Sequence, residues 1–306
     1  MLFNHNPELF CYFCNIIRLN TFVQMKKLLL FVLVLLCDFS IYAQNGVEQK
    51  YLLTMKTNTY GLSILSLTDP YLSPLTYTGN GIQFEHESRR CWSETNTRLS
   101  IQSKLDLDAG LLQNPAQNSN MTYVAVNYST GLHYKFKPVN GWLFLAGGSW
   151  DIGLGYKNVA RNVNNPGNVD LATNLNLSGI AMYDLQLNRR TYRLQLSVET
   201  PLIGWMYVPL QGASYYEMFR LGNLSGISHF SSVFNRRGIN PRLSVDVPFK
   251  RSVWRVGIQY RKLQYKANDM VFDRKETSLI LGTTFDVVHF GGRMRKAPTS
   301  FISPTD

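Results

Sequence analysis

Apolar and polar side chains alternate with a period of two in ten or more segments of this chain. The segment 241–249 is an example, because Leu243, Val245 and Val247 point to one side and Arg242 and Asp246 to the other. This pattern is typical of strands with one face in an apolar medium and the other toward a wet interior. The predicted strands are 58–67, 80–91, 98–111, 121–137, 142–156, 174–187, 191–202, 214–221, 227–234, 241–249, 252–264 and 277–290.

The predicted connections alternate between short and long along the chain. Those near 92–97, 138–141 and 188–190 are short, whereas those near 68–79 and 265–276 are longer. Short turns on one side and long loops on the other are typical of outer-membrane barrels. We therefore predict an all-β fold, a single antiparallel transmembrane β-barrel of about twelve strands. Ten or fourteen strands remain open, because the region 203–234 has little periodicity.

The chain begins with features of an export signal. Two lysines at 26–27 precede the apolar run 28–36, and a cleavage-like site follows at 41–44, with cleavage expected after Ala43. The apolar run is far shorter than the roughly 20 residues of a membrane-spanning helix, so it predicts a cleaved signal peptide. The expected organisation is an over-called N-terminal extension at 1–24, a signal peptide at 25–43, the barrel at 44–290 and a basic tail at 291–306.

The formal net charge of +11 changes the list of expected partners. In a cytosolic protein such a charge would raise nucleic acid as a partner, but an exported chain meets lipopolysaccharide phosphates instead. We expect outer-membrane lipids and lipopolysaccharide as partners, possible small solutes in the lumen, and no nucleic acid. The aromatic Phe290 at the end of the last predicted strand resembles the signal read by the barrel assembly machinery. No cofactor is implied, and Cys91 is the one cysteine in the predicted barrel.

Charged side chains on the polar faces of the strands must point inward, because each would cost a few kcal/mol against lipid. They could line an ion-selective channel or fill a closed lumen with ion pairs. The pairs at 85 and 87 and at 106 and 108 also have the spacing for acid/base chemistry or calcium, although lumen-lining alternation explains both. The predicted lumen-lining residues are Glu85, Glu87, Arg89, Lys104, Asp106, Asp108, His133, Lys135, Asp151, Arg193, Glu199, Arg242, Asp246, Arg255 and Arg261.

Several segments resemble a family of uncharacterised outer-membrane proteins from Bacteroidetes. They include Pro201-Leu202-Ile203-Gly204 and the stretch 211–219, in which Tyr215, Tyr216 and Glu217 are the most specific part. The resemblance implies a barrel of unknown function and transfers no catalytic residue. For the Tyr-Tyr-Glu stretch we expect a role in the aromatic girdle and strand register, with a plug or ligand contact at the barrel mouth as the alternative.

His229 and Ser231 form the sharpest catalytic candidate. Outer-membrane phospholipases and lipid A deacylases carry His-x-Ser on one strand, where period two places base and nucleophile on the same face. Here Ser232 and Leu243 stand where those enzymes have an orienting polar residue. The leading hypothesis is therefore a non-enzymatic barrel, a narrow channel or envelope-maintenance protein. A lipid hydrolase is the second hypothesis, and a periplasmic or soluble β-structure is the third.

Overall fold

A computed structural model of the protein describes residues 51–137, 140–163, 165–187, 190–249, 252–288 and 300–305. The predicted extension at 1–24, the signal peptide at 25–43, Phe290 and most of the tail lie outside the described residues. Within the described part, no helix is both long and apolar enough to cross a membrane.

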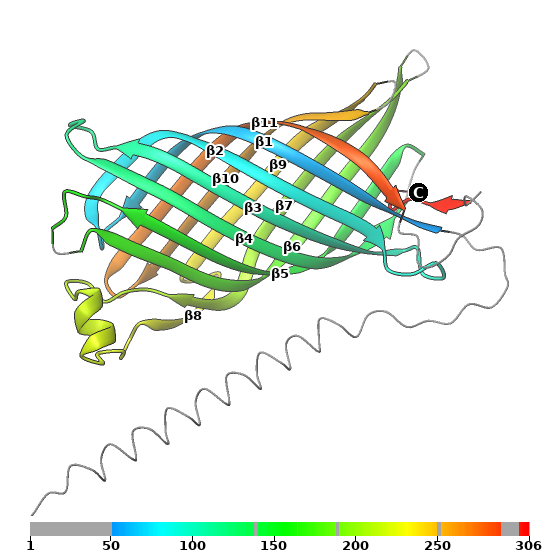
Figure 1. Cartoon of the computed structure of the whole chain (residues 1–306). Coiled ribbons are helices and arrows are strands. Elements are labelled where there is room, and N and C mark those ends of the chain that lie inside the picture. Colours follow the sequence, from blue (N-terminus) through cyan, green and yellow to red (C-terminus); the bar gives the residue numbers. More distant parts are fainter. Residues whose placement is uncertain are drawn as a thin grey trace, which may run out of the picture. The chain divides into compact units, whose positions relative to one another are not determined.

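Ten antiparallel strands close into a barrel, in which β1 pairs with β2 on one side and β11 on the other (Figure 1). The all-β, antiparallel barrel prediction is confirmed, and the estimate of about twelve barrel strands is wrong by two. The barrel strands are β1 (Tyr51–Asp69), β2 (Ser73–Cys91), β3 (Leu99–Gln113), β4 (Asn120–Phe136), β5 (Trp142–Asn158), β6 (Gly167–Leu187), β7 (Arg190–Tyr207), β9 (Arg236–Pro248), β10 (Val253–Ala267) and β11 (Met270–Val288).

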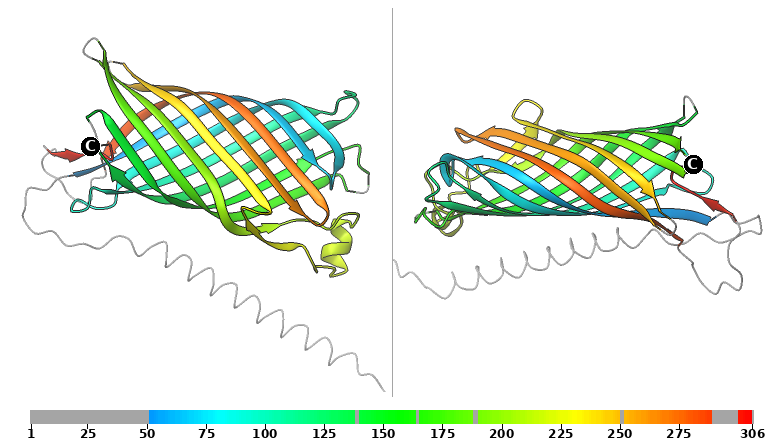
Figure 2. Two further views of the ribbon diagram at one scale, coloured as in Figure 1. Left: turned by 180° about the vertical axis from the view of Figure 1, so that it is seen from behind. Right: turned by 90° about the horizontal axis from the view of Figure 1, so that it is seen from above.

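Two short strands lie outside this closed sheet. β8 (Ser228–Ser232) pairs with the last residues of β7, and β12 (Phe301–Ile302) pairs in parallel with the first residues of β1. We call the end of the barrel near the β1–β2 turn the loop end, and the end near Tyr51 and β12 the terminal end. Both views in Figure 2 show the longest connection, between β7 and β9, at the loop end.

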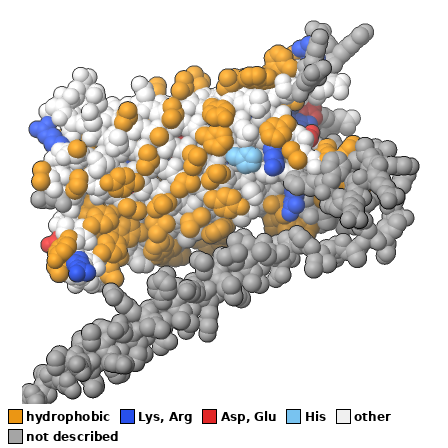
Figure 3. Space-filling view, viewed as in Figure 1, with side chains coloured by type: hydrophobic (Ala, Val, Ile, Leu, Met, Phe, Trp, Pro, Cys, Tyr) orange, Lys and Arg blue, Asp and Glu red, His pale blue; other side chains and the backbone are white. Residues whose placement is uncertain are grey.

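Apolar side chains cover the outer wall of the barrel (Figure 3). On β9, Leu243 is 45% exposed, whereas Arg242 is 5% exposed and Asp246 is 6% exposed. The sidedness predicted for this strand is therefore correct. We call this outer surface the apolar belt; its members include Tyr60, Leu62, Ile64, Ile82, Leu107, Val124, Val126, Leu132, Leu154, Leu194, Leu196, Leu243, Val256, Ile258, Leu279 and Leu281.

Toward the loop end the inner face of the strands becomes apolar and the outer face becomes polar. This change explains two errors in the predicted connections. On β1, Ile64 is 69% exposed and faces outward, but Leu65 and Leu67, at 1% and 0%, face the interior. The predicted loops at 68–79 and 265–276 are wrong, because the strands continue with apolar residues inside and polar residues outside. The connections that remain are residues 70–72 and a turn at Asn268 and Asp269, whose φ angles are 49° and 58°. Asparagine and aspartate tolerate this left-handed backbone better than most residues.

The predicted strand 214–221 is also wrong. These residues form η1 (Tyr216–Arg220), a single π-helical turn, and the predicted strand 227–234 is reduced to β8. Ser214 and Glu217 bond reciprocally: the Ser214 N–H donates to Glu217 Oε2 at 2.6 Å, and the Glu217 N–H donates to Ser214 Oγ at 3.2 Å. This is a capping box, which favours a helical turn over a strand.

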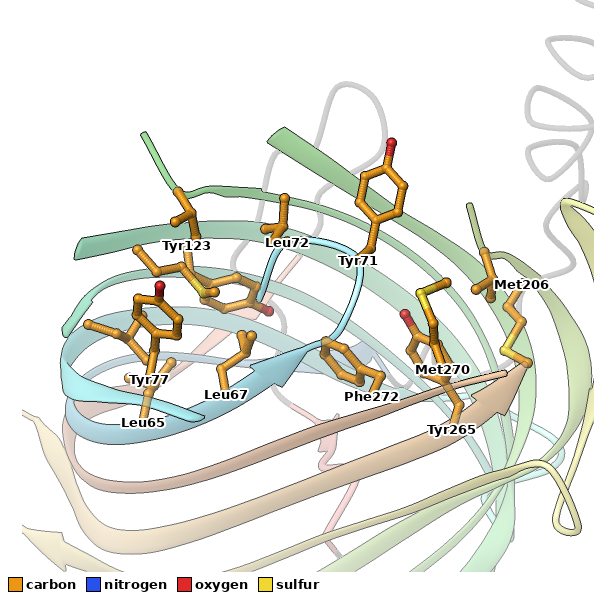
Figure 4. Packing of buried hydrophobic residues seen from close by; sticks show 14 of the residues in the cluster. Leu65, Leu67, Tyr71, Leu72, Tyr77, Tyr123, Met206, Tyr265, Met270 and Phe272 are labelled. Atoms are coloured by element: carbon orange, nitrogen blue, oxygen red, sulfur yellow. The ribbon is translucent and has the colours of Figure 1, made fainter. Parts of the chain in front are cut away.

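A cluster of buried apolar residues fills the interior at the loop end (Figure 4). Tyr71 and Leu72 of the β1–β2 turn fold into this cluster, which we call the loop-end cluster. A smaller cluster of Leu143, Leu145, Ile180 and Met182 lies on β5 and β6. The loop-end cluster contains Leu65, Leu67, Tyr71, Leu72, Tyr77, Leu112, Met121, Tyr123, Val159, Ala172, Met206, Val208, Met218, Tyr265, Met270 and Phe272.

Candidate functional site: the charged lumen

The polar faces of the strands bring most of the predicted lumen-lining residues into the buried interior. Lys104, Asp151, Arg193 and Glu199 keep partial exposure. A residue two positions along a strand stays on the same face, so the alternation alone delivers these side chains to the lumen. The buried members are Glu85, Glu87, Arg89, Asp106, Asp108, His133, Lys135, Arg242, Asp246, Arg255 and Arg261.

Several ion pairs cross the lumen between strands that are not neighbours in the wall. Arg242 of β9 donates two hydrogen bonds to Glu85 of β2, and Lys104 of β3 pairs with Glu199 of β7. Arg261 of β10 donates to both oxygens of Asp108 of β3, at 2.9 and 2.7 Å. These contacts span the interior from β2 and β3 to β7, β9 and β10.

A second group of charges lies nearer the terminal end. Arg255 donates to both oxygens of Asp246 at 2.7 and 2.9 Å, and its guanidinium lies 3.5 Å from Glu87. Glu87 also accepts from Arg89 at 2.9 Å and from Gln102 at 2.7 Å. Charges removed from water need such partners, because an unpaired buried ion costs several kcal/mol. We call the lumen-crossing pairs and this group together the charge network.

The remaining predicted residues lie around this network. His133 shares a hydrogen bond of 2.9 Å with Ser178, and Lys135 donates to the Pro304 carbonyl at 3.2 Å. Residues 300–305 thus contact the interior at the terminal end, where the sequence predicted only a basic tail. Arg193 pairs with Asp184 at 2.6 and 2.8 Å on the neighbouring strand, with both side chains partly exposed.

Sequence reasoning missed the charges nearest the loop end. Lys157 is 0% exposed and bonds to Asp69 at 2.5 Å and to Asp170 at 2.7 Å. The predicted strand 142–156 ended one residue before Lys157, although Lys157 continues the inward alternation of that strand. Two further arginines, Arg236 and Arg274, were missed because their segments were assigned to loops.

The structure does not assemble a catalytic site at His229 and Ser231. Both lie on β8, but the Ser231 hydroxyl donates to Asn174 at 3.4 Å. Among the described residues, no hydrogen bond joins the two side chains, and the buried Nε2 of His229 has no hydrogen-bond partner. The hydrogen bond between base and hydroxyl that a catalytic pair uses is therefore not formed in this arrangement.

Tyr215 fastens the β7–β8 connection to the barrel rim. Its hydroxyl donates to Asn168 at 2.8 Å and accepts from the Val169 N–H at 2.8 Å, and its ring packs edge-on against Tyr71. Burial raises the pKa of the Tyr215 phenol, which keeps the donating proton in place. Tyr216 is exposed and Glu217 caps the turn, so Tyr215 and Glu217, rather than Tyr216, hold this loop at the loop end.

A cavity lies inside the barrel toward the loop end. It has a volume of about 190 Å³ and lies between the charge network and the loop-end cluster. We call it the chamber; its lining includes Asp106, Asp108, Asp151, Asp170, Arg236, Arg261, Tyr265, Phe272 and Arg274. No group of three or more metal-ligating side chains is present in the described part of the chain.

Comparison with known proteins identifies a family but no function. A family model described as "Protein of unknown function (DUF3316)" matches residues 28–294. None of the curated proteins matches the chain significantly.

Among solved structures, the chain is similar to the translocator domain of autotransporter NalP from Neisseria meningitidis, with 8% identity, 88% of this chain and 98% of that chain covered, and a TM-score of 0.41. It is also similar to the outer-membrane protease OmpT from Escherichia coli, with 6% identity, coverage of 81% and 100%, and a TM-score of 0.42. A FadL homologue from Pseudomonas aeruginosa matches with 8% identity, coverage of 77% and 90%, and a TM-score of 0.28. Similarity at this level leaves the function to be argued from this chain's own residues.

Proposed function

The chain belongs to the DUF3316 family, whose description assigns no function, and we propose a function from the geometry of this chain. The protein is a non-enzymatic outer-membrane barrel with a sealed lumen. It serves the cell envelope and does not conduct solutes. The observation that carries the proposal is the set of ion pairs that cross the lumen, Arg242–Glu85, Arg261–Asp108 and Lys104–Glu199. A barrel of ten strands is close to the size that side chains can fill.

The apolar belt supports the location of the barrel in a membrane. A closed sheet with apolar side chains outside and charges inside is the reverse of a water-soluble barrel. Aromatic residues near the terminal end of the belt, including Tyr134, Phe136, Trp142 and Trp254, fit an interfacial girdle. An outer-membrane location also agrees with the export signal expected from residues 25–43, which lie outside the described residues.

The orientation follows from charges at the loop end. Beyond the apolar belt, Arg237, Lys262, Lys266 and Lys275 are exposed on β9, β10 and β11. Lys262 and Lys275 are direct cross-strand partners. Asp273 pairs with Lys275 at 3.2 Å, and an anion between the two lysines would reduce the repulsion between Lys262 and Lys275 further. The lipopolysaccharide phosphates of the outer leaflet supply such anions, so we place the loop end outside the cell.

The lipid-hydrolase alternative has less support. It needs a hydrogen bond from Ser231 to His229, and the described contacts join Ser231 to Asn174 instead. A narrow channel remains the closer alternative, since both readings use the same inward charges.

Single-channel conductance of the refolded protein in planar bilayers tests the proposal. We expect no stable conductance steps from the wild type, and steps from a D108A/R261A variant, in which one lumen-crossing pair is gone. Stable wild-type steps that change when Arg255 or Glu199 is neutralised would overturn the sealed lumen in favour of a selective channel. Heat-modifiable migration on gels confirms that each variant is folded.

A further inference from the structure

The chamber is small, with charged residues on one side and aromatic residues on the other. Its floor is made by Asp108 and Arg261 of the charge network, and Tyr265 and Phe272 of the loop-end cluster line it from the other side. These two rings stack at 4.6 Å between centroids. A volume of about 190 Å³ holds roughly six water molecules at about 30 Å³ each, or one small organic molecule.

The carboxylates that line the chamber have partners. Asp108 is bonded to Arg261, and Asp170 is bonded to Lys157. Asp151 accepts from the backbone and side-chain amides of Asn174 at 3.1 and 2.8 Å, and from Asn176 at 2.7 Å. Asp106 is the direct cross-strand partner of Glu85. The carboxylates of Asp108, Asp151 and Asp170 are therefore committed to contacts within the protein.

Two arginines of the chamber have no such partner. The polar contact of Arg236 is a long one, 3.8 Å from Nη1 to the Sδ of Met206, and its guanidinium lies 5.8 Å from the Tyr265 ring centre. Arg274 donates to the Tyr123 hydroxyl. The Nε atoms of both arginines are buried without a hydrogen-bond partner, and no ion pair to a carboxylate is present for either among the described residues.

We propose that the chamber is a binding site for a small amphipathic anion, with its acid group on Arg236 and Arg274 and its apolar body against Tyr265 and Phe272. Arginine presents a planar set of donors that suits carboxylate and phosphate oxygens. The stacked rings give the apolar part a dry surface. The inference rests on the proposed sealed lumen, because an open pore would leave both guanidinium groups in bulk water.

Calorimetric titration of the detergent-refolded full chain tests this site. The probe is benzoate, and the matched ligands are benzylamine, which reverses the charge, and acetate, which lacks the ring. We expect saturable benzoate binding to the wild type and at least about tenfold weaker binding of both matched ligands. The R236Q and R274Q variants should bind benzoate about tenfold more weakly than the wild type. A tenfold loss of affinity corresponds to one charge-assisted contact.

R237Q is the control variant, because Arg237 is exposed on the outer face of the same strand. It should bind benzoate as the wild type does. If a variant fails the heat-modifiability test, R236K provides a second comparison, which should retain part of the affinity. Absence of benzoate binding at millimolar concentration, or binding unchanged by R236Q and R274Q, would overturn the site. Conductance is recorded on the same preparation. Conductance steps from the wild type would contradict the sealed lumen, whereas absence of benzoate binding would contradict the binding site, so the two failures can be told apart.

Discussion

Arg261 of β10 holds Asp108 of β3 across the lumen through two hydrogen bonds of 2.9 and 2.7 Å. Three strands, β11, β1 and β2, separate them in the wall. The Arg261 guanidinium also donates to Gln83 at 2.7 Å. A contact of this kind ties opposite sides of the barrel together, and it supports the proposed sealed lumen.

Loss of Asp108 should destabilise the barrel strongly. D108N removes the closest carboxylate from the buried Arg261 and leaves it with Gln83 and with Glu276 at 3.4 Å. Breaking a buried pair costs about 3–5 kcal/mol, and the remaining contact with Glu276 places the expected loss at the lower end of this range. The measurement is the free energy of unfolding in urea for protein refolded into lipid vesicles.

The Arg193–Asp184 pair is the control for this comparison. It has similar two-point geometry, but its side chains are 24% and 36% exposed. D184N should therefore cost about 1 kcal/mol or less. Equal losses in the free energy of unfolding for D108N and D184N would show that the lumen-crossing pair stabilises the barrel no more than the exposed pair does.

Replacement of Ser231 should leave the protein's behaviour toward lipids unchanged. Its hydroxyl donates to Asn174 rather than to His229, so S231A removes one hydrogen bond and no nucleophile. Fatty-acid release from phospholipid vesicles is the measurement, with H229A as the matched variant. Release by the wild type that disappears in both variants would favour the hydrolase.

The contact between β7 and β9 should be the least stable part of the barrel wall. The β7–β9 ladder ends at Glu199 and Asn240, and β7 pairs with β8 from Ile203 onward. Between these points a hydrogen bond of 2.8 Å from the Thr200 hydroxyl to the Gly238 carbonyl joins the two strands. We expect amides in 198–204 to have about 1 kcal/mol less protection than those in 127–133 of β4, for each ladder bond absent.

Hydrogen exchange followed by mass spectrometry checks this difference. The β4 segment is the reference because it is paired on both sides along its length. Equal protection of the two segments would contradict a local weakness.

The loop that Glu217 caps should loosen in acid. The Ser214 backbone N–H and then its hydroxyl hold the pKa of Glu217 below its ordinary value of 4.5. A lowered pKa in the folded state means that the stabilisation is complete above the ordinary pKa and is lost as pH falls through the lowered value.

Exchange of amides in 211–221, corrected for the intrinsic pH effect, should therefore rise below about pH 4. E217Q should remove this pH dependence, because glutamine does not titrate. S214A keeps the carboxylate and should instead weaken the cap at every pH. A wild-type response identical to that of E217Q would contradict the capping role.

The sequence by itself determined the barrel class and the direction of most side chains in it. Period-two alternation sets which face of a strand is apolar, and this is a local property that needs no partner. Arg242, Arg255 and Glu85 could therefore be assigned to the interior from the sequence. The same reasoning ended strands too early toward the loop end, as in β1, which continues past 67 to Asp69, because it assumed that the apolar face of a strand points outward along its whole length.

Only the tertiary structure decided which charges meet across the lumen. The partners Arg261 and Asp108 are 153 residues apart, and their meeting depends on strand number and register around the closed wall. The same closure left Arg236 and Arg274 without carboxylates beside a small chamber. No local pattern encodes such distances, because they arise when β11 closes onto β1.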